Sequence, residues 1–331
     1  MTRHRGRAAA LAVALVLVAG CTQTDVPEEL PGPTSTTVPP TEAPAETADC
    51  DPDTVTQSLR PAGPATTDVD PGSYMATIRD RGRLRVGVDT STLLFSSVDP
   101  LSGDFVGFDI EIAREVATAL FGGPDAIEFV AIPKSERVSA LLGEDALDLV
   151  ADTFTINCER AAEIDFSSEY FTSHQRLLVR SDDPATSVEE LVANAETAGD
   201  DPPKVCAPAG STSLRNLEAL TDPPELVAAP SQGACLVRLQ RGEVAAISTD
   251  DTILAGMVAQ DPNLAIVGEP FSTEPYGLGL PPGREEWVRY VNAVLEDVRD
   301  SGRWSELYNE WIAAHMDPAD PADPPEPAYR D

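Results

Sequence analysis

The chain has 331 residues, a formal net charge of −33 and five cysteines. It is long enough for one large or two ordinary domains with hydrophobic cores, and too poor in cysteine to be a disulfide-built miniprotein. So negative a surface repels nucleic acid and anionic lipid head groups, which argues against DNA or RNA as a partner.

The N-terminus carries an export signal. Residues 1–20, "MTRHRGRAAALAVALVLVAG", place three arginines before an apolar stretch that ends on small residues. This order is typical of a signal peptide, because the stretch is too short and wrongly flanked for a membrane-spanning helix. The following "VAGC" resembles a bacterial lipobox, which implies that Cys21 is acylated and holds the protein to the bilayer on the outer face of the cell membrane. The alternative is a secreted protein in which Cys21 is incidental.

Two segments flank the folded part. Residues 21–73 are rich in Thr, Pro, Ala and Glu, and residues 317–331, "DPADPADPPEPAYRD", are rich in Pro and Asp. Neither composition buries enough apolar surface to fold, so we predict a disordered tether and a disordered tail. The folded part then runs from about residue 74 to residue 316.

Within the folded part, short apolar strands alternate with amphipathic helices, which predicts an α/β architecture. Strands are expected at 83–88, 127–132, 147–151, 204–209, 244–249 and 264–268, and helices at 107–121, 135–143, 158–164, 212–220, 235–242, 251–260, 285–300 and 304–316. The runs "ALLGEDALDLVAD" and "RLQRGEVAAISTD" follow the same order of helix end, strand and Asp, which suggests two similar lobes built on parallel strands. Ligands of open α/β sheets bind beyond the carboxyl ends of strands, so the loops after these two strands are expected to face one cleft.

Three loops carry the polar chemistry. In "DTFTINCER", Thr153 and Thr155 alternate along the loop, and Arg160 lies one turn into the next helix, where its guanidinium can reach back. Hydroxyls, a planar fork of donors and a helix N-terminus suit a carboxylate, which accepts bidentate hydrogen bonds. A surface ion pair between Arg160 and Glu163 is the alternative.

The other two loops follow strands of the second set. Ser211 and Thr212 offer hydroxyl and backbone donors at a helix start, although simple capping explains them equally well. Asp251 can cap the helix that it begins, which leaves Asp250 to accept from an ammonium group. Together the three loops complement an α-carboxylate and an α-amino group.

The order of motifs "GFDIEIAREVA", "TFTINCERAAEIDFSSEYF", "STDDTILAG" and "VNAVLEDVRDSGRWSELYNEWI" resembles the family 3 extracellular solute-binding proteins, the amino-acid receptors of ABC importers. The resemblance covers nearly all of residues 83–312 and is strongest to the glutamine-, glutamate- and aspartate-binding lipoproteins. It implies a two-lobed periplasmic-binding-protein type II fold, hinged around a cleft. Lobe one would comprise 74–172 and 277–316, and lobe two 173–276.

The resemblance also implies the contacts of the ligand. Arg160 would hold the α-carboxylate with Thr155, Ser211 and Thr212. Thr153 and Asp250 would receive the α-amino group.

For the ligand side chain, Asp89 aligns with an aspartate that reads an amide, whereas Lys134 and Arg137 favour a carboxylate. Gln232 aligns with a side-chain contact of acidic-ligand receptors and is neutral on this question. Of the family's aromatic clamp, Phe95 matches, whereas Thr92 and Lys134 replace aromatics. The implied ligand is glutamate, aspartate, glutamine or asparagine.

The implied function is delivery of that amino acid to an ABC permease by a monomer without cofactor or metal. A sensor that signals through a membrane partner with the same pocket is the alternative. We see no G-x-S-x-G, H-E-x-x-H or P-loop motif, so an enzyme is not expected.

The cysteines other than Cys21 number four, which allows three pairings in an exported compartment that permits disulfides. With the lobes that the resemblance implies, Cys206 pairs with Cys235 inside lobe two, which leaves Cys50 with Cys158. Free buried thiols are the alternative.

Overall fold

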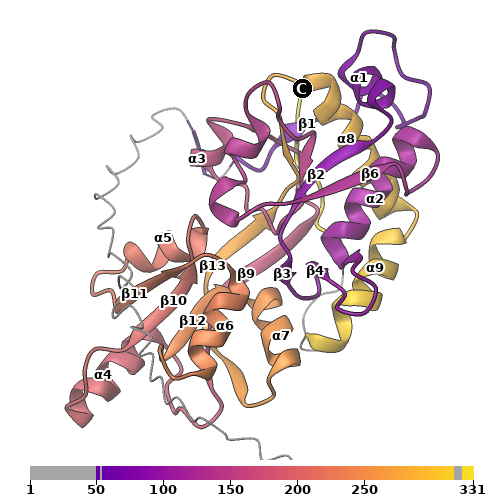
Figure 1. Ribbon diagram of the computed structural model, residues 1–331. Helices are drawn as coiled ribbons and strands as arrows, with labels where there is room; N and C mark the ends of the chain where they lie inside the picture. The colour runs from indigo at the N-terminus through magenta and orange to yellow at the C-terminus, as the bar shows by residue number, and fades with distance from the viewer. Residues whose placement is uncertain (1–49, 53, 317–322) are drawn as a thin grey trace, which may run out of the picture. The chain divides into compact units, whose positions relative to one another are not determined.

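The computed structural model describes residues 50–52, 54–316 and 323–331. The expected signal peptide, Cys21 and the first part of the expected tether lie outside these residues. The described chain is a mixed α/β structure with two five-stranded sheets (Figure 1). No helix in the described part of the chain combines the length and the apolar composition that a membrane span needs.

The first sheet has the strand order β6-β2-β7-β14-β8. Its strands are β6 (Ile127–Ala131), β2 (Leu84–Val88), β7 (Leu149–Val150), β14 (Gly279–Leu280) and β8 (Asp165–Phe166). Strand β2 pairs in parallel with β6 and β7, whereas β14 pairs antiparallel with β7 and β8. We call this sheet and the helices packed on it lobe one.

The second sheet has the strand order β11-β10-β12-β9-β13. Its strands are β11 (Glu225–Ala229), β10 (Lys204–Pro208), β12 (Ala246–Asp250), β9 (Phe171–Arg180) and β13 (Leu264–Tyr276). Here β10 pairs in parallel with β11 and β12, and β9 pairs antiparallel with β12 and β13. We call this sheet and its helices lobe two. The two sheets have equivalent strand arrangements, and β7 and β12 each occupy the third position. The similar runs "ALLGEDALDLVAD" and "RLQRGEVAAISTD" predicted this likeness between the lobes.

Helices pack on both sheets. Lobe one has α1 (Tyr74–Arg81), α2 (Phe108–Phe121), α3 (Cys158–Ala161), α8 (Glu285–Asp300) and α9 (Arg303–Trp311), and lobe two has α4 (Val188–Ala198), α5 (Thr212–Glu218), α6 (Gln232–Gln240) and α7 (Asp251–Gln260). The apolar stripe predicted for α2 is fully buried at Phe108, Ile112, Val116 and Leu120, because it faces the lobe-one core. A small sheet of β3 (Ser91–Thr92), β4 (Ser96–Val98) and β5 (Phe105–Val106) completes lobe one.

The helix expected at 135–143 does not form. The chain makes two 3-10 turns instead, η1 (Lys134–Glu136) and η2 (Ser139–Leu141). Beside these turns the Nε of the buried Arg137 donates to the carbonyl oxygen of Lys134 at 3.0 Å. Strands β9 and β11 and helix α4 were not expected from the sequence.

Strands β9 and β13 connect the lobes and run side by side along most of their length (Figure 1). At one end, Leu178 and Leu264 pack in a lobe-two core. At the other end, Phe171 and Tyr276 pack in the lobe-one core. Two adjacent chain crossings of this kind are suited to a hinge, since few backbone segments must bend for the lobes to move.

The predictions of a disordered tether and a disordered tail are wrong for the described residues of both segments. Strand β1 (Ser58–Leu59) pairs in parallel with β15 (Tyr329–Arg330). The Ser58 hydroxyl donates to the Phe166 carbonyl at 2.8 Å and accepts from the Asn292 amide at 2.8 Å. Composition misled the prediction because these partners are supplied by lobe one and are invisible in the local sequence.

Both favoured disulfide pairings are present in the structure. Cys50 is bonded to Cys158, which ties the N-terminal segment to α3. Cys206 is bonded to Cys235, which ties β10 to α6.

Candidate functional site

A group of polar side chains meets where the loops after β7, β10 and β12 come together. The space among them measures about 10 Å³, roughly the least that holds one water molecule. It is lined by Lys134, Arg137, Thr153, Thr155, Ser211, Thr212, Ser213, Gln232, Thr249, Asp250 and Ile253. Most of the residues predicted from the sequence are therefore brought together, and both lobes contribute.

Two larger hollows, of about 480 and 660 Å³, lie elsewhere in the described chain. The first runs beside the N-terminal segment and α3, and the second lies on lobe two beside Phe271. None of their charged lining residues is buried, so neither combines desolvation with charge as the small site does.

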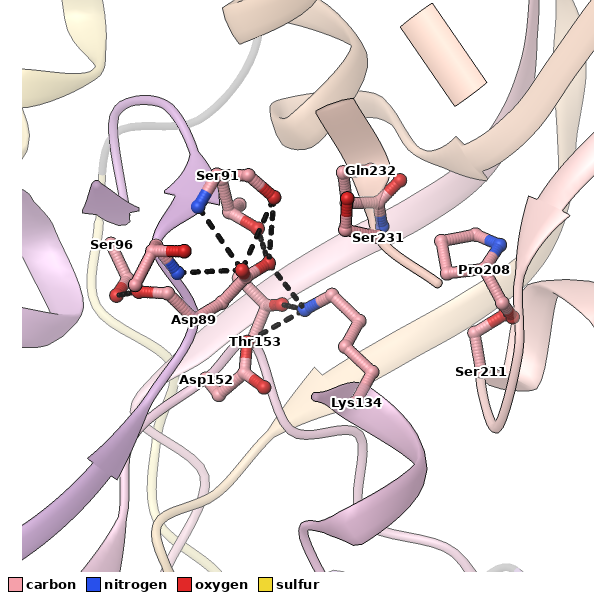
Figure 2. A network of polar contacts seen from close by, with 12 residues as sticks. Asp89, Ser91, Ser96, Lys134, Asp152, Thr153, Pro208, Ser211, Ser231 and Gln232 are labelled. Carbon is pink, nitrogen blue, oxygen red and sulfur yellow. Dashed lines mark hydrogen bonds and ion pairs between the residues drawn. The ribbon is translucent and has the colours of Figure 1, made fainter. Parts of the chain in front are cut away.

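Lys134 is the buried cation at one end of the site. Its ammonium lies 2.6 Å from Asp152 Oδ1 and 3.0 Å from Thr153 Oγ1, and 3.9 Å from Asp89 Oδ2. Figure 2 shows the lysine extended toward these three residues. Burial raises the pKa of Asp152 against the opposing pull of Lys134 and Arg137. The charge of Lys134 is thus already matched by carboxylates, a pairing that the sequence analysis did not foresee.

Asp89 lies beside the site rather than on its lining. Its carboxylate accepts from the backbone of Thr90 and Ser91 at 2.6 and 3.0 Å and from the Thr92 hydroxyl at 2.7 Å. Burial acts to raise the pKa of Asp89, but Lys134 and these hydrogen bonds outweigh it and hold the pKa below its usual value. Asp89 therefore adds negative charge near Lys134 while its oxygens are occupied by its own turn.

Arg137 holds the loop after β7 in place. Its Nη1 donates to the Asp152 carbonyl at 3.0 Å, and its Nη2 donates to the Gly210 carbonyl of lobe two at 3.3 Å. The guanidinium carbon lies 4.5 Å from the centre of the Phe154 ring, a favourable cation–π arrangement. Arg137 is therefore a positioning residue for the site as well as a source of positive charge.

Arg160 is the second arginine on the Phe154 ring and is 4% exposed. Asn157 caps α3 by accepting from the Arg160 backbone, which sets the start of the helix. The guanidinium donates to the carbonyls of Thr155 at 2.6 Å and Gly210 at 3.2 Å. The described residues show no ion pair between Arg160 and Glu163, so the surface-pair alternative does not hold. Burial, together with Arg137 and Arg215, lowers the pKa of Arg160 well below its usual value. A buried cation bonded to carbonyls gains strongly from a carboxylate.

Gly210 is the point at which lobe two approaches the two arginines. Its φ is +74°, and a Cβ there would lie 2.7 Å from the Ser135 Cα. Only glycine meets both conditions without strain. The carbonyl of Gly210 therefore accepts from both Arg137 and Arg160 across the lobe contact.

Glu274 is a buried residue of the site that the sequence analysis missed. It lies on β13, and its Oε2 accepts from the hydroxyls of Thr155 at 2.8 Å and Thr212 at 2.6 Å. Asn216 and Ser272 donate to its other oxygen. Both threonine hydroxyls were expected to donate to a ligand carboxylate; since they donate to Glu274, they are left as acceptors. The available signal was an acidic residue in "TEPY", residues 273–276, just before the expected return of the chain to lobe one at residue 277.

Ser211 is the N-cap of α5. Its hydroxyl accepts from the Leu214 backbone at 3.0 Å and donates to the Pro208 carbonyl at 2.7 Å. The Ser211 side chain therefore caps α5, as the capping alternative held, and its contact with a ligand stays a prediction.

Asp250 ends β12 and makes no capping bond, although it occupies the N-cap position of α7. Its carboxyl accepts from the Tyr276 hydroxyl, whereas Asp251 accepts from the Ser173 hydroxyl at 2.6 Å. Burial, followed by the nearby charge of Glu274, raises the pKa of Asp250 to about 7. A nearby cation stabilises a carboxylate that burial and a neighbouring negative charge disfavour, which fits the expected contact of Asp250 with an ammonium group.

Gln232 reaches the site from the start of α6. Its amide nitrogen donates to Thr249 Oγ1 at 3.0 Å, and the side chain is 1% exposed. Its amide oxygen has no hydrogen-bond partner among the described residues. A buried oxygen of this kind costs free energy until a donor reaches it, so the site has a place for an N–H group.

The prediction that Phe95 contacts the ligand is wrong. The ring is fully buried in the lobe-one core, 5.2 Å from the Phe171 ring centre and 5.9 Å from that of Tyr276. The chain turns after Asp89 so that the ring enters this aromatic cluster instead of the polar site.

Asp109 supports the loop after β7 from behind. Its carboxyl accepts from the backbone of Thr153 at 2.7 Å and from the Tyr170 hydroxyl at 2.7 Å. Thr153 has a φ of +40°, which is unfavourable for a β-branched residue. Burial raises the pKa of Asp109 to about 7. The hydrogen bond from Asp109 compensates the strained turn that aims Thr153 toward Lys134.

Two lobes with the same sheet order, two connecting strands and a buried polar site between them define a two-lobed, hinged binding protein. Residues 84–314 match the family model of the bacterial extracellular solute-binding proteins, family 3, and the chain belongs to this family.

The chain is similar to several named proteins. The ABC transporter glutamine-binding protein GlnH of Bacillus subtilis is 33% identical over 73% of this chain and 85% of that protein. The glutamate-binding protein GluB of Corynebacterium glutamicum is 30% identical over 62% of this chain and 70% of that protein. The solved structure of an ancestral arginine-binding protein bound to glutamine has a TM-score of 0.63 and 31% identity, covering 70% of this chain and 98% of that one. Family membership confirms the expectation of a binding protein rather than an enzyme.

Proposed function

We propose that the protein binds glutamine, asparagine, glutamate or aspartate and delivers it to an ABC permease outside the cytoplasm. The observation that carries the proposal is that a buried arginine and a buried carboxyl from opposite lobes, Arg137 and Asp250, line one site. Arg160 lies beside Arg137, because both donate to the Gly210 carbonyl. An α-amino acid supplies the two complementary charges. The named glutamine- and glutamate-binding relatives support this class of ligand.

The ligand carboxylate would take the donors of Arg160 that now reach Thr155 and Gly210. The ammonium group would donate to Asp250 and to the hydroxyl oxygens of Thr155 and Thr212, which are acceptors because their protons go to Glu274. Each charge-assisted hydrogen bond contributes about 1.5–3 kcal/mol, and micromolar affinity needs about 8 kcal/mol. A handful of these contacts is sufficient.

Binding requires motion of the lobes. A space of about 10 Å³ does not admit an amino acid, and Gly210 bridges the lobes through Arg137 and Arg160. The lobes therefore open to admit the ligand and close on it, with β9 and β13 as the hinge. The closed surface is what a permease would recognise.

We also propose that a lipid on Cys21 holds the protein, as a monomer, at the outer face of the membrane. The motif "VAGC" after the apolar stretch supports this. Metabolic labelling with a radioactive fatty acid should mark the wild-type protein and leave Cys21→Ser unlabelled.

The proposal is tested by calorimetric titration of the protein with each of the twenty amino acids. We expect micromolar or tighter binding of at least one of the four named ligands. Arg160→Ala should remove it, while Arg180→Ala, which changes an exposed arginine of lobe two, should leave it intact. Binding of none of the four would refute the proposal.

A further inference from the structure

The end of the site around Lys134 is electrically balanced. Lys134 lies 2.6 Å from Asp152 and 3.9 Å from Asp89, and Arg137 Nε lies 3.9 Å from Asp152 Oδ2. Two cations therefore face two carboxylates, and all four side chains are at most 6% exposed. Buried charges interact strongly because little water screens them, so this balance governs which side chain is accepted.

The same end offers both a donor and an acceptor. The Lys134 ammonium has three N–H groups, of which the hydrogen bonds to Asp152 and Thr153 use two. Gln232, which also lines the site, has a buried amide oxygen without a partner in the described chain. Figure 2 shows Lys134 and Gln232 entering from different segments, with the cluster of Asp89 and Asp152 at the tip of the lysine.

We propose that the protein selects a carboxamide side chain over the corresponding acid, and that Asp152 sets this selectivity by neutralising Lys134. This inference rests on the proposed function. A carboxamide accepts from Lys134 through its oxygen and donates to Gln232 through its nitrogen. It adds no charge to a balanced pocket.

A carboxylate side chain fits this end poorly. It has no N–H for the Gln232 oxygen, and its negative charge faces Asp152 and Asp89, which already match the two cations. By their charge alone, Lys134 and Arg137 would favour a ligand with an acidic side chain. Asp152 removes this preference because it neutralises the positive charge at this end of the site. Asp152 acts through Lys134 and does not line the site itself, so it is a positioning residue.

The inference is tested by titrating glutamine, asparagine, glutamate and aspartate into the wild-type protein and into Asp152→Asn. The wild type should bind the better amide at least tenfold more tightly than its acid. In Asp152→Asn this ratio should shift by at least tenfold toward the acid, because Lys134 is left with uncompensated charge. Asp182→Asn makes the same change at an exposed ion pair of lobe two and should leave the ratio unchanged.

Lys134→Met supplies an independent arm if Asp152→Asn does not fold. It removes the nearer cation and leaves Asp152 with Arg137 alone, so the ratio should move at least tenfold further toward the amide. A structural role alone would weaken both ligands equally and leave the ratio unchanged, which would overturn the role of Asp152. A wild type that prefers the acid would overturn the selectivity while the proposed function stands, whereas binding of none of the four would refute the proposed function.

Discussion

The two lobes have the same strand order but opposite chemistry at the rims that face each other. Lobe one presents three buried cations, Lys134, Arg137 and Arg160. Asp89 and Asp152 of the same lobe balance the first two, which leaves Arg160 as the excess positive charge. Lobe two presents Gln232 and Asp250 and, at Gly210, a carbonyl that lobe one uses as an acceptor.

This difference shows that the sheets provide position and the loops provide charge. Because β7 and β12 occupy equivalent places, the loops that follow them meet, and each lobe supplies what the other lacks. The zwitterionic ligand proposed above would bridge these halves, and its binding would then favour their closure. Four measurements test this contrast between the lobes.

The largest effect is expected for Asp250→Asn on the rim of lobe two. Removing one partner of a buried charge pair costs about 2–5 kcal/mol, so affinity for the amino acid should fall about thirtyfold or more. Since the pKa of Asp250 is raised to about 7, wild-type affinity should also weaken as the pH falls below 7, because protons compete with the ammonium group. Calorimetry between pH 5 and pH 8 checks both effects, and an unchanged pH profile in the variant would contradict the assignment.

The matching test on lobe one concerns Asp109 and the stability of the fold. Its pKa of about 7 lies above the ordinary 3.8, so the folded state binds more protons between these values. The contribution is fully present below about pH 4 and is lost as the pH rises through 7, at up to about 1.4 kcal/mol per pH unit. Urea unfolding should show that Asp109→Asn loses less stability than the wild type between pH 5 and pH 8. Parallel pH dependences would contradict this.

The contact between the lobes is tested by Gly210→Ala. A left-handed backbone costs an L-residue about 1–2 kcal/mol, and the new Cβ would lie 2.7 Å from Ser135 across the lobe contact. Affinity should fall about tenfold as closure is hindered. Gly242→Ala is the matched control, because its φ is +68° but nothing lies within 4 Å. Equal affinity losses in the two variants would show that backbone strain alone is responsible.

The smallest effect is expected for deletion of residues 317–331. The carbonyls of Ala328, just before β15, and of Arg330 accept from the backbone of Ser58 at 3.0 Å and Arg60 at 3.3 Å, and the two bonds together contribute about 1–3 kcal/mol. Hydrogen exchange should become faster in β1 and along α8, where Asn292 holds Ser58. Strand β12 of lobe two serves as the internal control. Faster exchange in β12 as well would show that the pairing of β1 with β15 stabilises both lobes.

Much of the fold is readable from the sequence. The apolar periodicity of α2 and the alternation of strands and helices predict the α/β layers. The similar sequence runs that contain β7 and β12 predict two similar lobes. Both kinds of pattern depend on local geometry. Residues whose partners are distant in the chain are different. Phe95 enters an aromatic cluster, and Ser58 finds Asn292, only after the lobe-one core has assembled.

That cations, hydroxyls and an aspartate follow the strands can be read along the chain, since strand ends and loop composition are local properties. The pairing of these groups with one another depends on the folded arrangement of distant segments. Asp152 forms an ion pair with Lys134, and Glu274 accepts hydrogen bonds from the hydroxyls of Thr155 and Thr212. The reason is physical: the chemistry of a buried polar group depends on which other group shares its desolvated space, and that neighbour is chosen by folding.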